Sequence, residues 1–271
     1  MSALLASGAR AFSQDNPLGQ FDGHGDIGSP DIAGSASYDP AAQTYTLTGG
    51  GINMWSTNDQ FHFLWKKMSG DFILRTRVEF VGKGVEEHRK VGWMARASLD
   101  SNAAYVDAVE HGVGLTSLQY RPDTGAKTAQ LVLPITSADI IQFERRGTNF
   151  IFSAARNGEM FISTNYSGTT LPDDVFAGLF ICSHNPKVKE EVIFHDVRII
   201  RPAAPHRIAR EPVPTMSTLA ERLSIRPKVA LERIESANSP SAIAKAAPAA
   251  ATMRQCAPPR RKPTAVSAPS A

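Results

Sequence analysis

Cysteine is scarce in this chain: its 271 residues include two, Cys182 and Cys256. So few cysteines exclude a disulfide-stapled scaffold and a cysteine-rich zinc site. Cys182 falls in an apolar run typical of a strand, whereas Cys256 falls in a proline-rich terminal segment, so we do not expect them to pair. Within its run, Cys182 is most simply a buried, small apolar residue.

Long apolar runs are also missing. No stretch approaches the roughly 18 apolar residues that a membrane-spanning helix needs, so no transmembrane segment is predicted. The first residues, MSALLASGARAFSQD, place Ala9 and Ala11 in the A-x-A arrangement that ends a signal peptide. The apolar part is only ALLA, however, and no basic residue precedes it. We expect residues 1–16 to be disordered or the remnant of a signal peptide.

Glycine, phenylalanine, tryptophan and tyrosine are all absent from the sequence after Pro202. A segment built mainly from Ala, Pro, Ser, Arg and Lys cannot bury enough apolar surface to offset the entropy lost on ordering. We therefore predict a disordered tail over 202–271, in which TMSTLAERLSI (215–225) has the spacing of one short helix. Lys and Arg outnumber Asp and Glu in this tail, so the tail accounts for the net positive charge of the chain. That charge therefore does not indicate a nucleic-acid groove in the rest of the protein, and no nucleic-acid partner is predicted.

The middle of the chain has the pattern of an all-β protein. Short runs rich in Val, Ile, Phe, Tyr and Thr recur between Gly, Asp, Asn and Pro, and none has a clean helical period. In DFILRTRVEF, Phe72, Leu74 and Val78 share one face of a strand, while Arg75 and Arg77 share the other. Strands are predicted at 44–49, 61–68, 70–82, 90–98, 103–112, 114–121, 129–134, 139–147, 149–158, 159–167, 175–183 and 191–200. Their even spacing favours two packed antiparallel sheets.

Turn residues mark several joints between these runs. RNGE (156–159) places Asn-Gly between two strand patterns, which is the strongest short hairpin signal. RRGTN (145–149) supplies a second glycine turn. Both predict antiparallel neighbours in the sheets.

Several ordered motifs resemble a known family. They are DGHGDIGSP, YDPAAQTYTLTGGGINMWSTNDQFHFLWKKMSGDFILRTRVEF, KVGWMARASLD, HGVGLTSLQYR and AGLFICSHNP, followed by VIFHDVRII. Over about residues 17–201 the chain resembles the concanavalin-A-like jelly-roll domain found before TolB-like propellers in bacterial exported, biopolymer-transporter-related proteins. The resemblance implies a two-sheet jelly-roll sandwich and a periplasmic or secreted location. The propeller that would follow has no counterpart in 202–271, so no activity of such a domain is carried over.

Glucanases share the jelly roll and are expected to carry catalytic carboxylates as E-x-D-x-x-E on one strand. The mechanism needs two carboxyl groups about 5 Å apart. No such run occurs: VEEH (85–88) falls in a glycine-bounded loop, and Asp107 and Glu110 have a spacing that puts them on opposite faces of a strand. We therefore favour a non-catalytic module, with an unusual glycan hydrolase as an alternative.

Metal-ligand spacing is weak, because the seven histidines show no H-x-H or H-E-x-x-H pattern. The resemblance implies a structural calcium ion as one alternative, since jelly rolls of this type often hold one through carboxylates and carbonyls. FDGHGDIG and FHDVRI would then meet on neighbouring edge strands, with Asp22, Asp26 and Asp196 as ligands. We favour the alternative that these residues form turns and caps, and no other cofactor is predicted.

Candidate ligand contacts follow from what sugar-binding surfaces need: aromatic faces for stacking, and polar side chains for hydroxyl groups. Trp55 lies in a polar segment, His62 lies opposite Phe61 and Phe63, and Arg96 presents a fork of donors or, alternatively, a salt bridge to an acid on a neighbouring strand. Phe61, Phe63 and Trp65 are expected in the core. The remaining candidates are Tyr105, His111, Gln119, Tyr120 and His184.

Loops 82–90 and 184–191 are expected to rim the site. The predicted function is a non-catalytic module that binds carbohydrate or another cell-surface polymer. The alternative from another class is a structural or protein-interaction domain.

Overall fold

A computed structural model describes residues 16–203 of the chain. The predictions for 1–15 and 204–271, including the helix over 215–225, lie outside the described residues. Within 16–203, no helix is long and apolar enough to cross a membrane.

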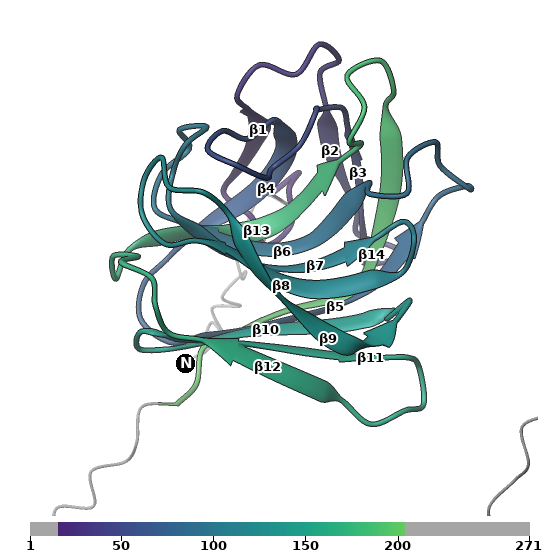
Figure 1. Cartoon of the computed structure of the whole chain (residues 1–271). Helices are drawn as coiled ribbons and strands as arrows, with labels where there is room; N and C mark the ends of the chain where they lie inside the picture. The colour runs from purple at the N-terminus through teal and green to yellow at the C-terminus, as the bar shows by residue number, and fades with distance from the viewer. Residues whose placement is uncertain (1–15, 204–271) are drawn as a thin grey trace, which may run out of the picture. The chain divides into compact units, whose positions relative to one another are not determined.

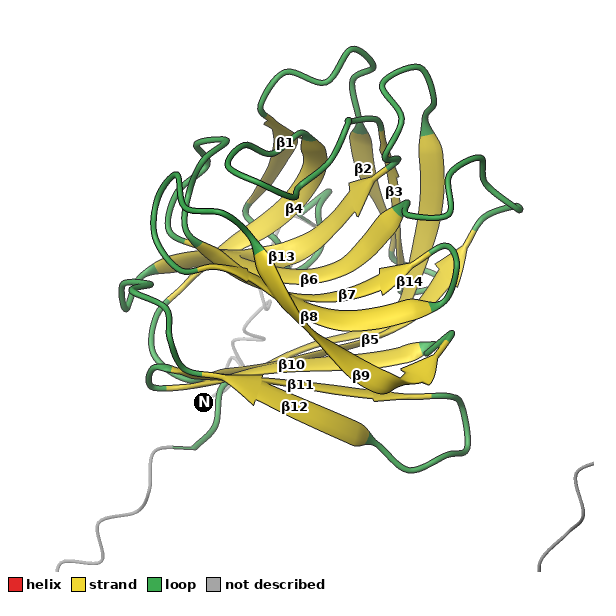
Figure 2. Ribbon diagram, viewed as in Figure 1, coloured by secondary structure: helices red, strands yellow, loops and turns green. Residues whose placement is uncertain are grey.

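Fourteen β-strands make up the described part, and they form two antiparallel sheets of seven strands each (Figures 1 and 2). Sheet A has the order β1-β4-β13-β6-β7-β8-β9, and sheet B has the order β12-β11-β10-β5-β14-β3-β2. The prediction of an all-β, two-sheet antiparallel jelly-roll sandwich is therefore confirmed. The strands are β1 (Gly23–Ile27), β2 (Ser35–Asp39), β3 (Thr44–Gly49), β4 (Phe61–Met68), β5 (Phe72–Phe80), β6 (Lys90–Arg96), β7 (Tyr105–His111), β8 (Leu115–Arg121), β9 (Ala129–Thr136), β10 (Ile140–Arg146), β11 (Asn149–Ala155), β12 (Ile162–Tyr166), β13 (Val175–Cys182) and β14 (Glu190–Ile200).

Both predicted hairpins are present. Arg146 of β10 pairs with Asn149 of β11, and Gly147 between them has a φ of 59°, which a residue without a Cβ adopts at no cost. β11 and β12 pair antiparallel on either side of the Asn-Gly turn. The sequence pattern missed β1 and β2, the two edge strands at one end of the sandwich.

The main core lies between the sheets and follows the alternation of the strands. Phe72, Leu74 and Val78 of β5 enter it from sheet B, and Leu64 and Trp93 enter it from sheet A. Gly178 of β13 alternates to the opposite face, across from Trp65 of β4, where a Cβ would meet the carbonyl oxygen of Leu64. We call the side of sheet A that faces this core its inner face.

A second apolar cluster covers the opposite, outer face of sheet A. Phe61 and Phe63 are completely buried there with Met94 and Phe180, beneath Met54 of the segment that precedes β4. Phe61, Phe63 and Trp65 do share one face, as expected, but it is the outer face, and Trp65 is only partly buried. The polar segment 51–60 therefore closes over part of the sheet instead of extending into solvent.

Candidate functional site

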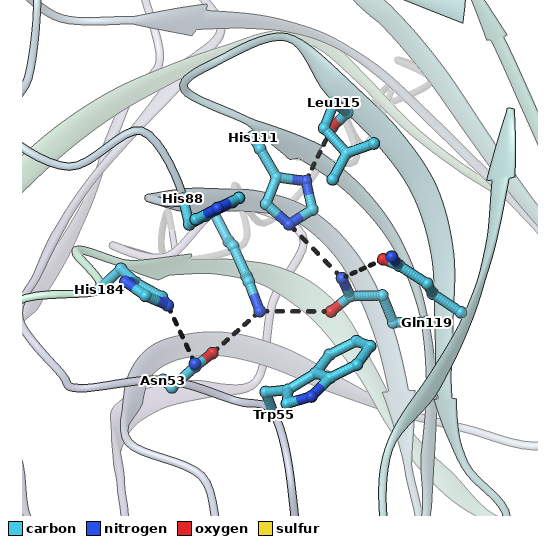
Figure 3. A pocket seen from close by; sticks show the side chains of 9 residues that line it. Asn53, Trp55, His88, His111, Leu115, Gln119 and His184 are labelled. Atoms are coloured by element: carbon cyan, nitrogen blue, oxygen red, sulfur yellow. Dashed lines mark hydrogen bonds between the residues drawn. The ribbon is translucent and has the colours of Figure 1, made fainter. Parts of the chain in front are cut away.

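A cavity of about 230 Å³ opens on the outer face of sheet A, beside the segment that covers it (Figure 3). Strands β6 to β9 supply its floor, and residues of three loops surround it. The lining residues are Asn53, Trp55, His88, Lys90, His111, Leu115, Gln119, Gln130 and His184.

Strand pairing explains why polar side chains gather on this floor. Lys90 lies directly opposite His111 across β6 and β7, and Gln119 lies directly opposite Gln130 across β8 and β9. Cross-strand partners carry their side chains on the same face. The outer face of the sheet is thus polar where the cavity lies and apolar where Met54 covers it.

One chain of hydrogen bonds runs across the floor and includes Asn53 and Gln119 (Figure 3). Lys90 joins these two amides. The ammonium of Lys90 donates to Asn53 Oδ1 at 2.9 Å and, more weakly, to Gln119 Oε1 at 3.5 Å. Because an ammonium can only donate, both amides turn their oxygens to it and their NH₂ groups away from it. The lysine therefore sets the orientation of both amides.

The two amides in turn set the state of two histidines. Asn53 Nδ2 donates to His184 Nε2 at 2.9 Å, and Gln119 Nε2 contacts His111 Nε2 at 3.4 Å. His111 Nδ1 donates to the carbonyl of Leu115 at 2.7 Å, so its Nε2 is the acceptor. Burial, with the charge of Lys90, lowers the pKa of His111 to about 3 and that of His184 below its ordinary value. Both rings are neutral near pH 7.

Trp55 forms an apolar wall of the cavity. Its side chain is 38% exposed, and the Lys90 ammonium lies 5.6 Å from the centre of its ring. An indole face next to a cation and fixed amides offers both a stacking surface and directional hydrogen bonds.

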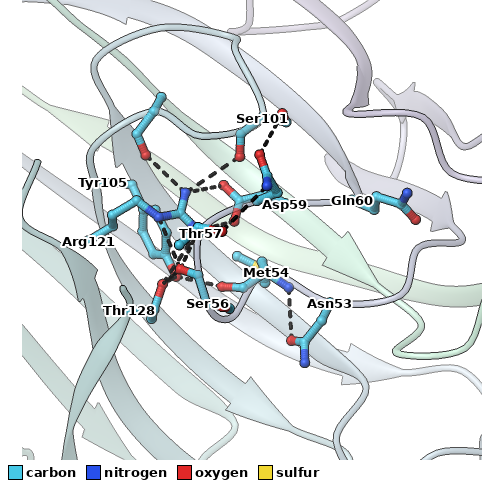
Figure 4. Close-up of polar contacts among 12 residues, drawn as sticks. Asn53, Met54, Ser56, Thr57, Asp59, Gln60, Ser101, Tyr105, Arg121 and Thr128 are labelled. Atoms are coloured by element: carbon cyan, nitrogen blue, oxygen red, sulfur yellow. Dashed lines mark hydrogen bonds and ion pairs between the residues drawn. The ribbon is translucent and has the colours of Figure 1, made fainter. Parts of the chain in front are cut away.

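The segment that carries Asn53 and Trp55 is fastened to the sheet by a buried ion cluster (Figure 4). Asp59 accepts from Arg121 at 2.6 and 2.8 Å and from Arg96 at 3.4 Å, and all three side chains are completely buried. Two parallel bonds between a guanidinium and a carboxylate fix geometry as well as charge. Arg96 thus makes the salt bridge that was its alternative assignment, although its partner lies in a loop instead of a strand.

Backbone carbonyls of the same segment are held as well. Arg121 Nη2 and the Thr128 hydroxyl donate to the carbonyl of Ser56 at 3.1 and 3.2 Å. The Tyr105 hydroxyl donates to the carbonyl of Met54 at 2.6 Å. Ser56 has a φ of 72°, which is uncommon for a residue with a side chain and is tolerated where the surroundings hold it. These bonds hold the backbone on both sides of Trp55, and they therefore fix its position.

Asp107 is a further ionisable group under this face. It is completely buried on β7, where Oδ1 accepts the N–H of Gln119 at 3.2 Å and Oδ2 has no partner among the described residues. Burial raises the pKa of its carboxyl well above its ordinary value. The nearby Lys90 opposes that effect without offsetting it.

The eight candidate ligand residues fall into two groups. The structure brings four of them together around the cavity: Trp55, His111, Gln119 and His184. The other four do not line it. Tyr105 and Arg96 are completely buried beneath segment 51–60. Tyr120 points to the inner face, where its ring stacks on Tyr166 with centres 3.6 Å apart.

His62 is the fourth residue outside the cavity. Its buried ring bonds to Asp26 Oδ1 at 2.7 Å and to His24 Nδ1 at 3.1 Å, near the edge strand β1. Burial lowers its pKa, and hydrogen bonding to Asp26 opposes this. The ring is thus satisfied by its own surroundings.

The three aspartates considered for calcium are not brought together. Asp22 bonds to Lys66, Asp26 bonds to His62 and to the N–H of Gly34, and Asp196 is exposed on β14 of the other sheet. Across residues 16–203, no group of three acidic, histidine or cysteine side chains could hold a metal ion. Asp22 also accepts the backbone N–H of Lys67.

Sequence reasoning named none of Asn53, Lys90, Leu115 and Gln130 as candidates, and treated His88 only as one of several scattered histidines. A signal was present for Lys90, because it alternates with Gly92, Met94 and Arg96 on the face opposite Trp93. The predicted rim loops 82–90 and 184–191 do contain His88, Lys90 and His184. Asn53 gave no signal, since its place depends on the fold of segment 51–60.

No protein-family model matches the sequence, and no curated protein matches it. Similar solved structures include a functionally unknown protein from Saccharomyces cerevisiae, with a TM-score of 0.48 and 14% identity over 63% of this chain and 93% of that chain. The carbohydrate binding module CBM66 from Bacillus subtilis has a TM-score of 0.42 and 14% identity over 67% and 98%. A xylan beta-1,4-xylosidase from Bacillus halodurans has a TM-score of 0.47 and 14% identity over 64% of this chain and 35% of that one. Likenesses at this level carry no argument about family or activity.

Proposed function

We propose that the chain is a carbohydrate-binding module that acts outside the cytoplasm and recognises its ligand by contact, with no covalent step. The observation that carries the proposal is the pairing of the Trp55 ring with a pre-ordered row of amide and imidazole groups on the floor of one cavity. An aromatic face packs on the apolar side of a sugar ring, and the polar row bonds to its hydroxyl groups.

The size of the cavity limits the part of the ligand that enters it. Its volume of about 230 Å³ is below the roughly 300 Å³ at which pockets for drug-sized molecules begin. One sugar residue is a unit of suitable size. The rest of a polymer would then lie outside, over the exposed Trp55 and His88.

The polar row is suited to recognition because it is already ordered. Lys90 and the two amides hold one another in place, so little side-chain entropy is lost when a ligand binds. A sugar hydroxyl group can both donate and accept, so it can accept the N–H of the Lys90 ammonium that is directed to neither amide.

Two features support binding without catalysis. No carboxylate occurs among the described residues that line the cavity, and Asp59 and Asp107 beneath it are completely buried. His111 has a pKa of about 3, which makes it a weak base near neutral pH. A glycan hydrolase would need two reachable carboxyl groups on either side of a bond.

Substitution of Trp55 tests the proposal. Glycan-array screening followed by calorimetry should find a sugar ligand, and Trp55→Ala should weaken its binding about tenfold, which corresponds to about 1.4 kcal/mol for one lost stacking contact. Phe161→Ala is the matched control, since that ring is 40% exposed and does not line the cavity. It should change the affinity less than twofold. No detectable sugar ligand, or an equal loss in both variants, would contradict the proposal.

A further inference from the structure

We infer that the sugar residue held in this cavity is acidic, with its carboxylate on the ammonium of Lys90. The inference rests on the proposed function and narrows it to uronic-acid-containing glycans. It is drawn from the charges beneath the cavity and from the hydrogen bonds that Lys90 makes.

The charges buried under the outer face of sheet A do not balance. Three positive charges lie there, on Lys90, Arg96 and Arg121. The two arginines share one negative charge, that of Asp59. Even with Asp107 fully ionised, one positive charge is left over. Buried charges are normally paired, because taking an unpaired ion out of water is costly.

Of these three cations, Lys90 is the one that makes no ion pair with an acidic side chain of residues 16–203. It is 3% exposed, and the side-chain oxygens to which its ammonium bonds, from Asn53 and Gln119, are neutral. Its third N–H has no hydrogen-bond partner within residues 16–203. Burial lowers the pKa of Lys90, and the acidic groups around it do not offset this effect.

The surroundings of the ammonium favour an anion over a neutral group. His88, His111 and His184 line the same cavity, and each could only add positive charge. The chain of bonds described above presents N–H groups from the floor, and a carboxylate accepts from several donors at once. Burial, followed by the charge of Lys90, lowers the pKa of both His111 and His184, and an anion bound to Lys90 would offset the second of these causes.

The geometry allows stacking and charge pairing by the same sugar residue. The Lys90 ammonium lies 5.6 Å from the centre of the Trp55 ring. A sugar ring packed on the indole therefore has its substituents within reach of the ammonium. In a uronic acid one of those substituents is a carboxylate, whereas in a neutral sugar the same position holds a hydroxymethyl group.

Methyl esterification provides a direct comparison, because it removes the charge and keeps the sugar ring. Oligomers of galacturonate, glucuronate and mannuronate would each be titrated into the wild-type protein by calorimetry, beside their methyl esters and neutral oligomers. At least one uronide should bind ten or more times tighter than its ester. A sulfated galactan oligomer tests whether any anion suffices, and its binding tighter than every uronide would overturn the carboxylate assignment.

Lys90→Gln supplies the second arm of the test. It should weaken uronide binding at least tenfold and reduce the ratio between uronide and ester to below threefold. Lys67→Gln removes a charge from the same sheet outside the cavity and should leave that ratio unchanged. If uronides and esters bind wild type equally, the inference fails and the proposed function stands. If no sugar binds at all, both fail.

Discussion

The Asp59→Asn substitution tests how the binding segment is fastened to the sheet. The change keeps the size of the side chain and removes the single negative charge that serves Arg96 and Arg121. Removing one partner of a buried ion pair typically costs about 3–5 kcal/mol, because the other charge stays buried and unpaired. Arg121 keeps the carbonyls of Ser56 and Ala103 as acceptors, so the lower end of that range applies.

We therefore expect the free energy of unfolding to fall by about 3 kcal/mol. For a domain of this size each kcal/mol lowers the Tm by about 2–4 °C, so the Tm should fall by roughly 6–12 °C. Urea unfolding followed by circular dichroism gives the free energy directly. Sugar affinity should fall as well, since the segment carries Asn53 and Trp55.

Asp71→Asn is the control, because that exposed carboxylate accepts one backbone N–H, from Gly147 at 2.7 Å, and makes no ion pair with the described residues. It should cost less than about 1 kcal/mol. If Asp59→Asn costs no more than this control, the ion cluster does not fasten the segment, and our account of the site is wrong.

Two further predictions concern pH. Burial raises the pKa of Glu110 to about 8 from an ordinary value of 4.5. The unfolded chain therefore loses this proton first, and the free energy of unfolding should decrease as pH rises from 4.5 to 8. Urea titrations across that range should show the decrease in wild type and a flatter profile in Glu110→Gln, and identical profiles would refute it. Burial lowers the pKa of His111 to about 3 from 6.5, so the folded state resists protonation and stability should be lost as pH falls from 6.5 towards 3. His111→Gln should reduce that loss in the same titration, and an unchanged acid limb would contradict the assignment.

Alternation along strands was sufficient to predict most of the fold. β4 has the predicted bounds, and Phe72, Leu74 and Val78 of β5 face the core as the pattern indicated. β1 was missed because GHGDI contains a single residue type that favours strands. The segment is extended because it pairs with β4. Residue propensities do not predict a strand whose extended conformation depends on pairing with a neighbouring strand.

The site was less predictable, for reasons that differ between residues. Alternation already places Tyr120 and Gln119 on opposite faces of β8, so the two could not both have met one ligand on the same face. Arg96 and Tyr105 do lie on the outer face, but segment 51–60 covers them. That cover depends on Asp59 reaching Arg121 from 62 positions earlier in the chain. Contacts of such long range leave no local pattern in the sequence.

In segment 51–60, the residues that attach the segment to the sheet differ from the residues that line the cavity. Met54 and Asp59 point down into the protein, whereas Asn53 and Trp55 face the cavity. Variation at the upward positions can therefore change selectivity without loosening the attachment. A combinatorial library restricted to residues 53 and 55 would therefore vary the recognition surface while the β framework stays constant.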